Sequence, residues 1–488
     1  MHRGPSGRLT PFLLDLGFTD ACFSPGPLAC CAVTMLALQA RNQPDFMFWG
    51  AALPAESEFS LEDPLALDYI NQQIGYLLLP ALTTRSAHAQ YFAVVLYGLE
   101  LVERALRAHD LPDDDRIRRE LFERWERFWA LACLESRKGA LTRSDPDAMR
   151  GVRGAQRAWF SGDNPLPLKY TLISRQSELG GLGAYLIPLR DLGLVYPGTL
   201  RVTPAAGPII EAFWEEADAP AHGSRFDNWA MSILAPTCTH TERKSQGIRL
   251  ATLGERSRLT SVLGRQRQQD RLFEAVITQA PPPTAELTSL VQTARLAEVE
   301  DPREILQGLL GGQFGPVGTP LRDHLALALS YGDMAVCLRD LFDAMYRDLM
   351  ETGNLVARAQ VVANAITAPR LEALRSAASA LLGTIELRRL RHLPAHGPAF
   401  VRLLELLVPA TPAEVLDLLL RYHRQIQRVR SSGSSWISEQ GDTLRADLTH
   451  YTGYQYAAPF PGFKLFILAS ILRSTGRLPA ATVAQEVA

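Results

Sequence analysis

Residues 168–207 read LKYTLISRQSELGGLGAYLIPLRDLGLVYPGTLRVTPAAG, the clearest succession of structural signals in the chain. A short helix through Leu172 and Ile173 is expected to reach the Gly180-Gly181 turn. A second helix should follow, and Gly193 is suited to end it. Its apolar residues recur at helical spacing and give one buried face: Leu182, Tyr185, Leu186, Leu189 and Leu192.

The residues after Gly193 predict a β-hairpin and then another helix. Two short apolar runs, 194–196 and 200–202, flank a Pro197-Gly198 turn. Thr203-Pro204 is a typical opening for the helix that continues to residue 214. Over about residues 168–217, this order of helix, turn, helix, hairpin and helix resembles winged helix-turn-helix domains.

The resemblance implies a nucleic-acid site. In winged-helix domains, the helix before the hairpin usually enters the major groove, and the hairpin reaches a flanking groove or a phosphate. Winged helices also serve as protein–protein modules, so double-stranded DNA and a protein partner both remain possible ligands. By position, the resemblance implies that four binding residues face outward: Arg175, Gln176, Arg190 and Arg201. An upstream basic run could add phosphate contacts through Arg150, Arg153 and Arg157.

Outside this stretch, helical periodicity dominates. The fold class we predict is mainly α and multi-domain, with an embedded winged helix-turn-helix and a small C-terminal β-hairpin plus helix. The expected domains are an irregular extension (1–46), a helical domain (47–162), the winged-helix module (163–220), a second helical domain (221–430, with a Pro-rich break at 281–283) and a small α/β element (431–488). Met47 is an alternative start of translation.

Apolar spacing, capping residues and prolines set the expected element bounds. The predicted helices span residues 60–79, 87–108, 112–132, 145–159, 285–297, 302–310, 320–351, 355–366, 369–390, 399–407, 412–430 and 462–474. A small hairpin is expected over 436–445, around Gly441-Asp442.

Composition excludes several classes of function. The 488-residue chain has a formal charge of −2, so it does not attract polyanions as a whole, and any nucleic-acid site must be local. Only four of its 50 cationic residues are lysine, which indicates a GC-rich bacterial genome. The sequence contains no G-x-x-x-x-G-K-[ST], H-E-x-x-H, G-x-S-x-G or G-x-G-x-x-G motif. The usual ATPase, zincin, hydrolase and dinucleotide-binding signatures are therefore missing.

Cysteine usage and hydropathy bear on the compartment. The six cysteines show no C-x-x-C spacing, which favours buried thiols in a reducing cytosol. The most apolar early run, residues 29–38, is far shorter than the roughly 20 residues that a membrane span needs. We expect a cytoplasmic protein with no membrane contact, no metal and no cofactor.

Two patterns keep a nucleic-acid hydrolase open as the alternative. R-x-x-x-x-H, a motif of HEPN-type ribonucleases, occurs at Arg104/His109, Arg391/His396 and Arg445/His450. Asp227, Glu242 and Lys244 match the loose D…E-x-K pattern of metal-dependent nucleases. Cys238 and His240 could donate to zinc but lack a second ligand pair, and the arginine-rich stretch 241–271 could follow a phosphate backbone or form a solvated face.

The leading prediction is a non-catalytic bacterial component of a multi-protein complex, which uses the winged helix to engage DNA or a protein. The chain also has a faint similarity to uncharacterised bacterial antiphage-defence proteins. It lies in residues 63–67 (DPLAL), residues 79–85 (LPALTTR), the winged helix, and the portion from Trp436 to Gly462-Phe463-Lys464. That similarity implies a subunit of a larger defence complex and specifies no activity.

Overall fold

The computed structural model describes residues 63–141, 149–163, 165–214, 225–234, 248, 265–429, 435–448 and 451–479. Two compact units divide the chain, residues 1–48 and 49–488, and every described residue belongs to the second. The predicted extension 1–46 lies outside the described residues. The described part is mainly helical, as predicted, and its three strands are all short.

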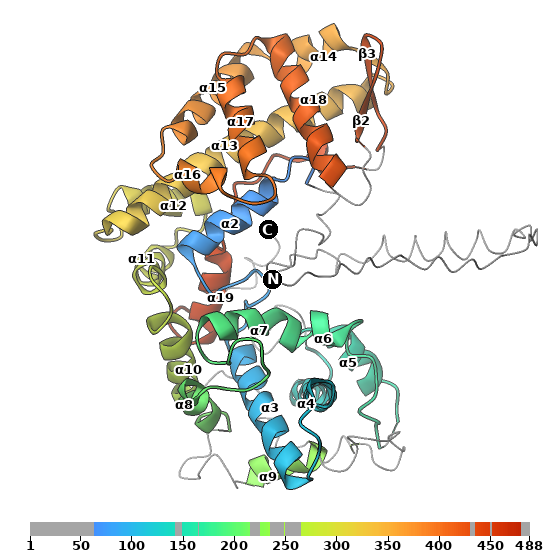
Figure 1. The fold of residues 1–488 in the computed structure, drawn as a ribbon, viewed down its shortest axis with the longest axis vertical. Coiled ribbons are helices and arrows are strands. Elements are labelled where there is room, and N and C mark those ends of the chain that lie inside the picture. The colour runs from blue at the N-terminus through green and yellow to red at the C-terminus, as the bar shows by residue number, and fades with distance from the viewer. Residues whose placement is uncertain are drawn as a thin grey trace, which may run out of the picture. The chain divides into compact units, whose positions relative to one another are not determined.

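Helices α3 and α4 lie within four residues of their predicted bounds, whereas α2 and α5 begin at Leu67 and Val152, about seven residues later than predicted (Figure 1). Asp63 lies in front of α2 and stabilises its first turn, because its carboxylate accepts hydrogen bonds from the backbone N–H groups of Leu67 and Asp68. Asp114 caps α4 in the same way, with Arg116 and Ile117 as donors. The elements up to residue 234 are α2 (Leu67–Leu78), α3 (Ala89–Ala108), α4 (Asp115–Ser136), α5 (Val152–Trp159), α6 (Gln176–Leu179), α7 (Gly181–Asp191), η2 (Pro204–Ala206), α8 (Gly207–Glu211) and α9 (Arg225–Leu234).

The second run of helices is built around α13 (Thr319–Glu351), which packs against α2, α12, α14 and α15. Its buried residues are almost all apolar, with Asp343 the exception among those described. The remaining helical elements are α10 (Gln266–Phe273), the π-helical η6 (Glu274–Thr278), α11 (Thr284–Leu296), α12 (Pro302–Leu310), α14 (Arg358–Ala365), α15 (Ala368–Leu382), α16 (Leu387–Arg391), α17 (Gly397–Leu407), α18 (Pro412–Val429), the 3₁₀ turn η7 (Gly453–Gln455) and α19 (Leu465–Ser474).

The predicted C-terminal hairpin is confirmed and gains a third strand. β2 (Ile437–Gln440) and β3 (Thr443–Ala446) pair antiparallel, and the sheet order is β1-β3-β2. β1 (Val356–Ala357) occupies positions that were predicted to begin a helix. Val356 pairs with Leu444, and the Asn354 amide donates to the Ala446 carbonyl, so tertiary pairing overrides the local helical pattern.

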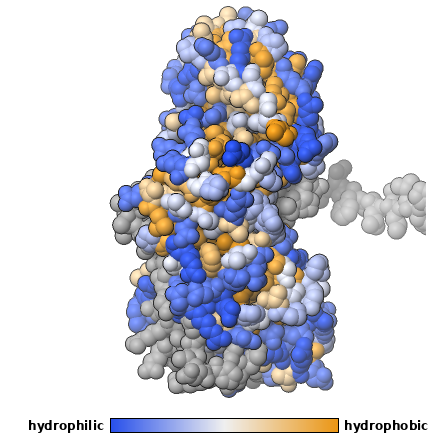
Figure 2. Space-filling model, turned by 90° about the vertical axis from the view of Figure 1, so that its left-hand side faces the viewer, coloured by the Kyte–Doolittle hydropathy of each residue, from blue (hydrophilic) through white to orange (hydrophobic). Residues whose placement is uncertain are grey.

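One apolar core runs through the described residues, from Leu65 in front of α2 to Leu478 after α19. On the face drawn in Figure 2, hydrophobic residues form several patches that hydrophilic residues separate. Among the helices that the structure describes, none combines the length and the apolar character needed to cross a bilayer.

Candidate functional site

Residues 163–214, hereafter the 163–214 module, contain the region of the predicted winged helix. Its helix-turn-helix begins later than predicted, because α6 starts at Gln176, after Arg175 adopts a left-handed φ of 48°. The second helix, α7, is confirmed, and it continues through the buried Pro188. A Cβ atom at Gly183 would lie 1.6 Å from the Glu178 carbonyl oxygen, so the tight α6–α7 turn requires glycine there.

The predicted hairpin is reduced to a single bridge. Val195 pairs with Val202, the Tyr196 N–H donates to the Arg201 carbonyl at 3.0 Å, and the Thr203 N–H donates to the Leu194 carbonyl at 2.9 Å. The helix predicted after it is split into η2 and α8, both short. These elements depend on the rest of the protein for their position, because helices of so few residues are not stable alone.

A buried carboxylate on α4 holds α6 and α7 in position. Glu126 accepts from the Tyr91 hydroxyl (2.8 Å), the Gln176 amide (2.8 Å) and the Gly181 N–H (2.6 Å), which opens α7. Burial raises the pKa of Glu126, although these three hydrogen bonds act in the opposite direction. Together the contacts fix α6 and α7 against α3 and α4.

Gln176 therefore does not face outward as the resemblance implied. Its side chain is only 6% exposed, because Glu126 and the Glu123 carbonyl accept from its amide. Arg150, another predicted phosphate contact, directs its Nε to the Leu179 carbonyl at the end of α6. Both side chains hold the helix-turn-helix in place, and in these positions they are poorly placed for a ligand.

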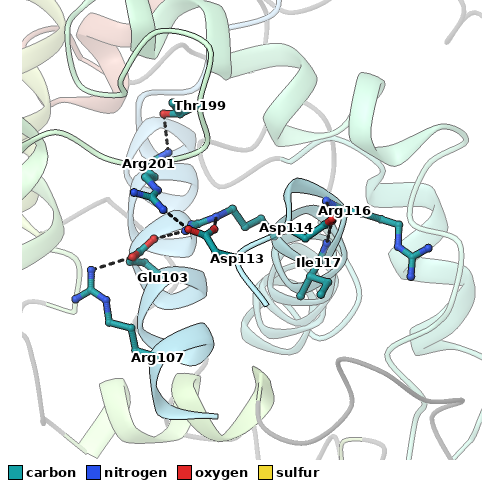
Figure 3. Close-up of polar contacts among 9 residues, drawn as sticks. Glu103, Arg107, Asp113, Asp114, Arg116, Ile117, Thr199 and Arg201 are labelled. Carbon is teal, nitrogen blue, oxygen red and sulfur yellow. Dashed lines mark hydrogen bonds and ion pairs between the residues drawn. The ribbon is translucent and has the colours of Figure 1, made fainter. Parts of the chain in front are cut away.

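Arg201 is drawn into an ion-pair network at the start of α4 (Figure 3). Its guanidinium contacts Asp113, which also accepts from Arg118 Nε at 2.6 Å. Arg118 in turn contacts Glu103 on α3 at 2.5 Å, and Arg107 reaches the same carboxylate at 2.8 Å. The hydrogen bond from Arg118, followed by the charges of Arg118 and Arg201, lowers the pKa of Asp113. The network ties the hairpin to α3 and α4.

The other predicted cations differ in their surroundings. Arg190 donates from Nη2 to the Thr199 carbonyl at 2.8 Å, which joins α7 to the hairpin. Arg175 is 61% exposed and lies 3.2 Å from Glu178. Arg153 and Arg157 are exposed on α5, four residues apart and so on one helical face. Of the seven predicted side chains, these last three and Arg201 are the exposed ones.

The two hydrolase candidates meet in one buried ion pair. Asp227 on α9 is fully buried and binds Arg104 on α3 through both oxygens, at 2.8 and 2.6 Å. The Tyr97 hydroxyl donates to the same carboxylate at 2.7 Å and accepts from the Trp214 indole. His109 lies exposed at the end of α3. This arrangement pins α9 to α3, and it gives Arg104 and His109 no common target.

The remaining hydrolase and zinc candidates are only partly described. Glu242, Lys244, Cys238, His240 and His450 lie outside the described residues, as does most of the arginine-rich stretch. His396 is buried against Tyr69 with its ring edge-on, and Arg391 pairs with Glu405. In the part of the chain that the structure covers, no three His, Cys, Asp or Glu side chains are grouped to hold a metal ion.

The segments that carry the faint antiphage similarity converge inside the fold. Lys464, 3% exposed, donates to the Leu82 carbonyl at 2.6 Å and lies 3.1 Å above the Tyr76 ring. Burial lowers the pKa of Lys464 to about 6, and Asp191 on α7 opposes that shift. These contacts join α19 to the α2–α3 loop.

A second contact of the same kind involves His423 on α18. The Trp436 N–H donates to its Nε2 at 2.9 Å, so Nδ1 carries the proton and donates to the Pro64 carbonyl at 2.9 Å. His423 thereby links residues near 64 and 436, which pattern reasoning could only place far apart. A buried histidine next to aromatic residues was the signal available in the sequence.

No protein-family model, curated protein or solved structure matches this chain.

Proposed function

We propose that this chain is a non-catalytic component of a multi-protein complex, and that the 163–214 module is a winged helix that binds a protein partner. The observation that carries the proposal is the outward face of α7. It consists of Leu186, Ile187, Arg190 and Asp191, of which Asp191 is exposed and the other three are half-buried, and Leu186 also packs against the apolar core. This face is apolar at its centre and its formal charges cancel, which suits a protein surface better than a phosphate backbone.

The hairpin adds an aromatic group to that surface. Tyr196 is 46% exposed beside the Pro197-Gly198 turn, and the Arg190–Thr199 hydrogen bond ties this turn to α7. Tyrosine is enriched in protein interfaces because it combines a large apolar ring with a hydroxyl group. Arg201, which would be the phosphate contact of a DNA-binding wing, already pairs with Asp113.

The setting we propose is a bacterial antiphage-defence complex in the cytoplasm, on the strength of the faint similarity described above. The contacts of Lys464 and His423 support only a structural role for these segments, which they hold together inside the fold. They supply no nucleophile and no metal site, so the proposal includes no reaction.

Isolation of the native complex tests the protein-binding proposal. The chain would be tagged in its bacterium, and the complex purified at native levels and its mass measured. Substitutions Ile187→Arg and Tyr196→Ala should release a stoichiometric partner. Ile385→Arg is the matched control, because Ile385 is 72% exposed and lies outside the module. A partner that both module variants retain, or a wild-type chain that migrates alone, would contradict the proposal.

DNA is the second candidate, and the exposed cations of α5 favour it. Arg153 and Arg157 on one helical face, with Arg175 nearby in sequence order, could neutralise phosphates without any base readout. Anisotropy of a labelled duplex across a salt series tests this. Binding should weaken by about one logarithmic unit per decade of salt for each phosphate neutralised.

The triple variant R153Q/R157Q/R175Q should lose that binding, whereas R402Q/R421Q/R445Q, with three exposed arginines from α17, α18 and β3, should keep it. Equal binding by both triple variants would show that Arg153 and Arg157 on α5 do not bind the DNA. No binding at the lowest salt would remove DNA as a ligand and leave the protein-binding proposal standing.

A further inference from the structure

A cavity of about 510 Å³ lies between α2 and α16, and none of the residues that line it belongs to the 163–214 module. Its size falls within the range of roughly 300–1,000 Å³ that is typical of small-molecule sites. Figure 1 shows α16 beside α2. The cavity is therefore separate from the surface that is proposed to bind a protein.

The floor of the cavity is apolar. Ile74 and Leu77 contribute from α2, and Leu390 and Leu393 from α16 and the residues that follow it. Tyr76 forms part of the same wall, and the ammonium group of Lys464 packs on its ring. Because Lys464 is itself fixed to the Leu82 carbonyl, this wall is held in position before any ligand arrives.

The rim of the cavity is cationic. Arg388, Arg389 and His392 line it, and no aspartate or glutamate does. The acid next to it in sequence, Glu386, is 6% exposed and contacts Arg389, with Arg388 at 3.9 Å. Arg388 is 72% exposed, so most of its hydrogen-bonding capacity points to solvent at the mouth of the cavity.

We propose that this cavity binds a small organic anion, with a carboxylate or phosphate group at the arginine rim and an aliphatic or aromatic body on the floor. Arginine suits such head groups because its planar guanidinium can donate two parallel hydrogen bonds. The apolar floor excludes a bare inorganic anion as the best ligand, since the floor would gain nothing from it.

Competition against a fluorescent probe tests the proposal on the full chain. 8-Anilinonaphthalene-1-sulfonate combines an anionic group with an aromatic body, and its fluorescence should rise on binding. Octanoate and octyl phosphate should both displace it if the shared chemistry is correct, and the stronger of the two identifies the preferred head group. Octylammonium, with the same body and the opposite charge, should displace it poorly.

Two variants and a matched control locate the site. Arg388→Gln should weaken octanoate competition about fivefold or more, since it removes one partly exposed ion pair to the ligand. Leu393→Trp should fill the cavity and abolish the competition. Arg402→Gln is the control, because Arg402 is 68% exposed on α17 and does not line the cavity.

The outcomes that overturn the proposal are distinct. Equal displacement by octylammonium and octanoate would show an apolar site with no anion preference. Unchanged competition in R388Q and L393W, or competition lost equally in R402Q, would place the probe elsewhere. Thermal unfolding of L393W checks that the variant folds, and R388Q keeps the test decisive if it does not.

Discussion

The 163–214 module and the helices of residues 302–429 are stabilised in different ways. In the module, α6, α7 and α8 have 4, 11 and 5 residues, and polar contacts from distant parts of the chain hold them. Gly181 bonds Glu126, 55 positions away, and Arg201 reaches Asp113, 88 positions away. In the second region, α13 alone has 33 residues and buries a long apolar face against its neighbours.

This difference shows which elements the sequence pattern alone can predict and which it cannot. A long amphipathic helix encodes its own burial in its 3.6-residue period, and any apolar neighbour satisfies it. A four-residue helix encodes almost nothing, so its position depends on one buried acceptor elsewhere. The module should accordingly be sensitive to single polar substitutions, and the 302–429 helices to loss of apolar volume.

The largest expected effect is from Glu126→Ala. It leaves the Tyr91 hydroxyl and the Gly181 N–H buried without their acceptor, and it leaves the Gln176 amide with only the Glu123 carbonyl. Unsatisfied buried donors cost about 1–3 kcal/mol each, so we expect a loss of about 3–5 kcal/mol in the free energy of unfolding, measured with urea. Glu120→Ala on the same helix, where the side chain is 52% exposed, should change it by less than about 0.5 kcal/mol.

The pH dependence of the free energy of unfolding provides a second test of the Glu126 contacts. Because burial raises its folded pKa above the ordinary 4.5, the folded state binds the extra proton. The contribution of Glu126 is full below pH 4.5 and declines as pH rises through the raised pKa. Wild type should therefore lose stability relative to Glu126→Gln over that rise. A difference that stays constant with pH would contradict the buried-carboxylate account.

Leu338→Ala is the matching test in the second region. Leu338 is fully buried on α13, and its truncation should cost about 3 kcal/mol through lost burial and a residual cavity. Unlike Glu126→Ala, the loss should not vary with pH, because no titrating group is involved. Leu296→Ala, at a position 59% exposed, is the control. A pH-dependent loss for L338A would blur the distinction between the two regions.

Much of the second region could be predicted from its sequence. The helix predicted at 302–310 is found as Pro302–Leu310, and that predicted at 412–430 as Pro412–Val429. Apolar spacing and proline positions are local signals, so they give these bounds to within a residue or two. The single helix predicted over 369–390 is wrong, however, because the chain leaves the helix after Leu382 and divides it into α15 and α16. The hairpin around Gly441-Asp442 follows from turn chemistry in the same way.

What the pattern missed depends on contacts across the chain. Gln176 was expected to face outward from its position in the winged-helix resemblance, but its amide donates to the buried Glu126 carboxylate instead. Arg104 and Asp227 entered two separate hypotheses and instead form one ion pair, across 123 positions. Residue type and spacing cannot reveal which buried acceptor meets which donor.

A smaller and pH-dependent effect is expected for Lys464→Met. The folded pKa of about 6 lies below the ordinary 10.5, so the unfolded chain binds more protons between these values. Wild-type stability should therefore rise with pH across that window, by at most about 1.4 kcal/mol per pH unit, and stay flat below it.

Lys464→Met should remove this slope, as followed by urea unfolding at several pH values. Lys138→Met, with a side chain 77% exposed, should leave it unchanged. A slope that persists in K464M would assign it to other groups. The two buried groups have opposite effects on the pH dependence. As pH rises, the wild type loses stability through Glu126 and gains stability through Lys464.

The smallest effect is expected for Arg201→Gln. This variant tests whether exposed ion pairs stabilise the module as much as the buried Glu126 does. Arg201 and Asp113 are 52% and 49% exposed, so water and salt screen their attraction. Arg118 still holds Asp113 and Glu103 after the substitution. The free energy of unfolding should fall by about 0.2–1 kcal/mol at low salt and by less at high salt. Arg116→Gln, 83% exposed, serves as the control.

A loss as large as that of Glu126→Ala would mean that surface pairs fix the module as firmly as the buried carboxylate. A small, salt-sensitive loss would locate the anchor at Glu126, with the hairpin free to adjust when Tyr196 meets a partner.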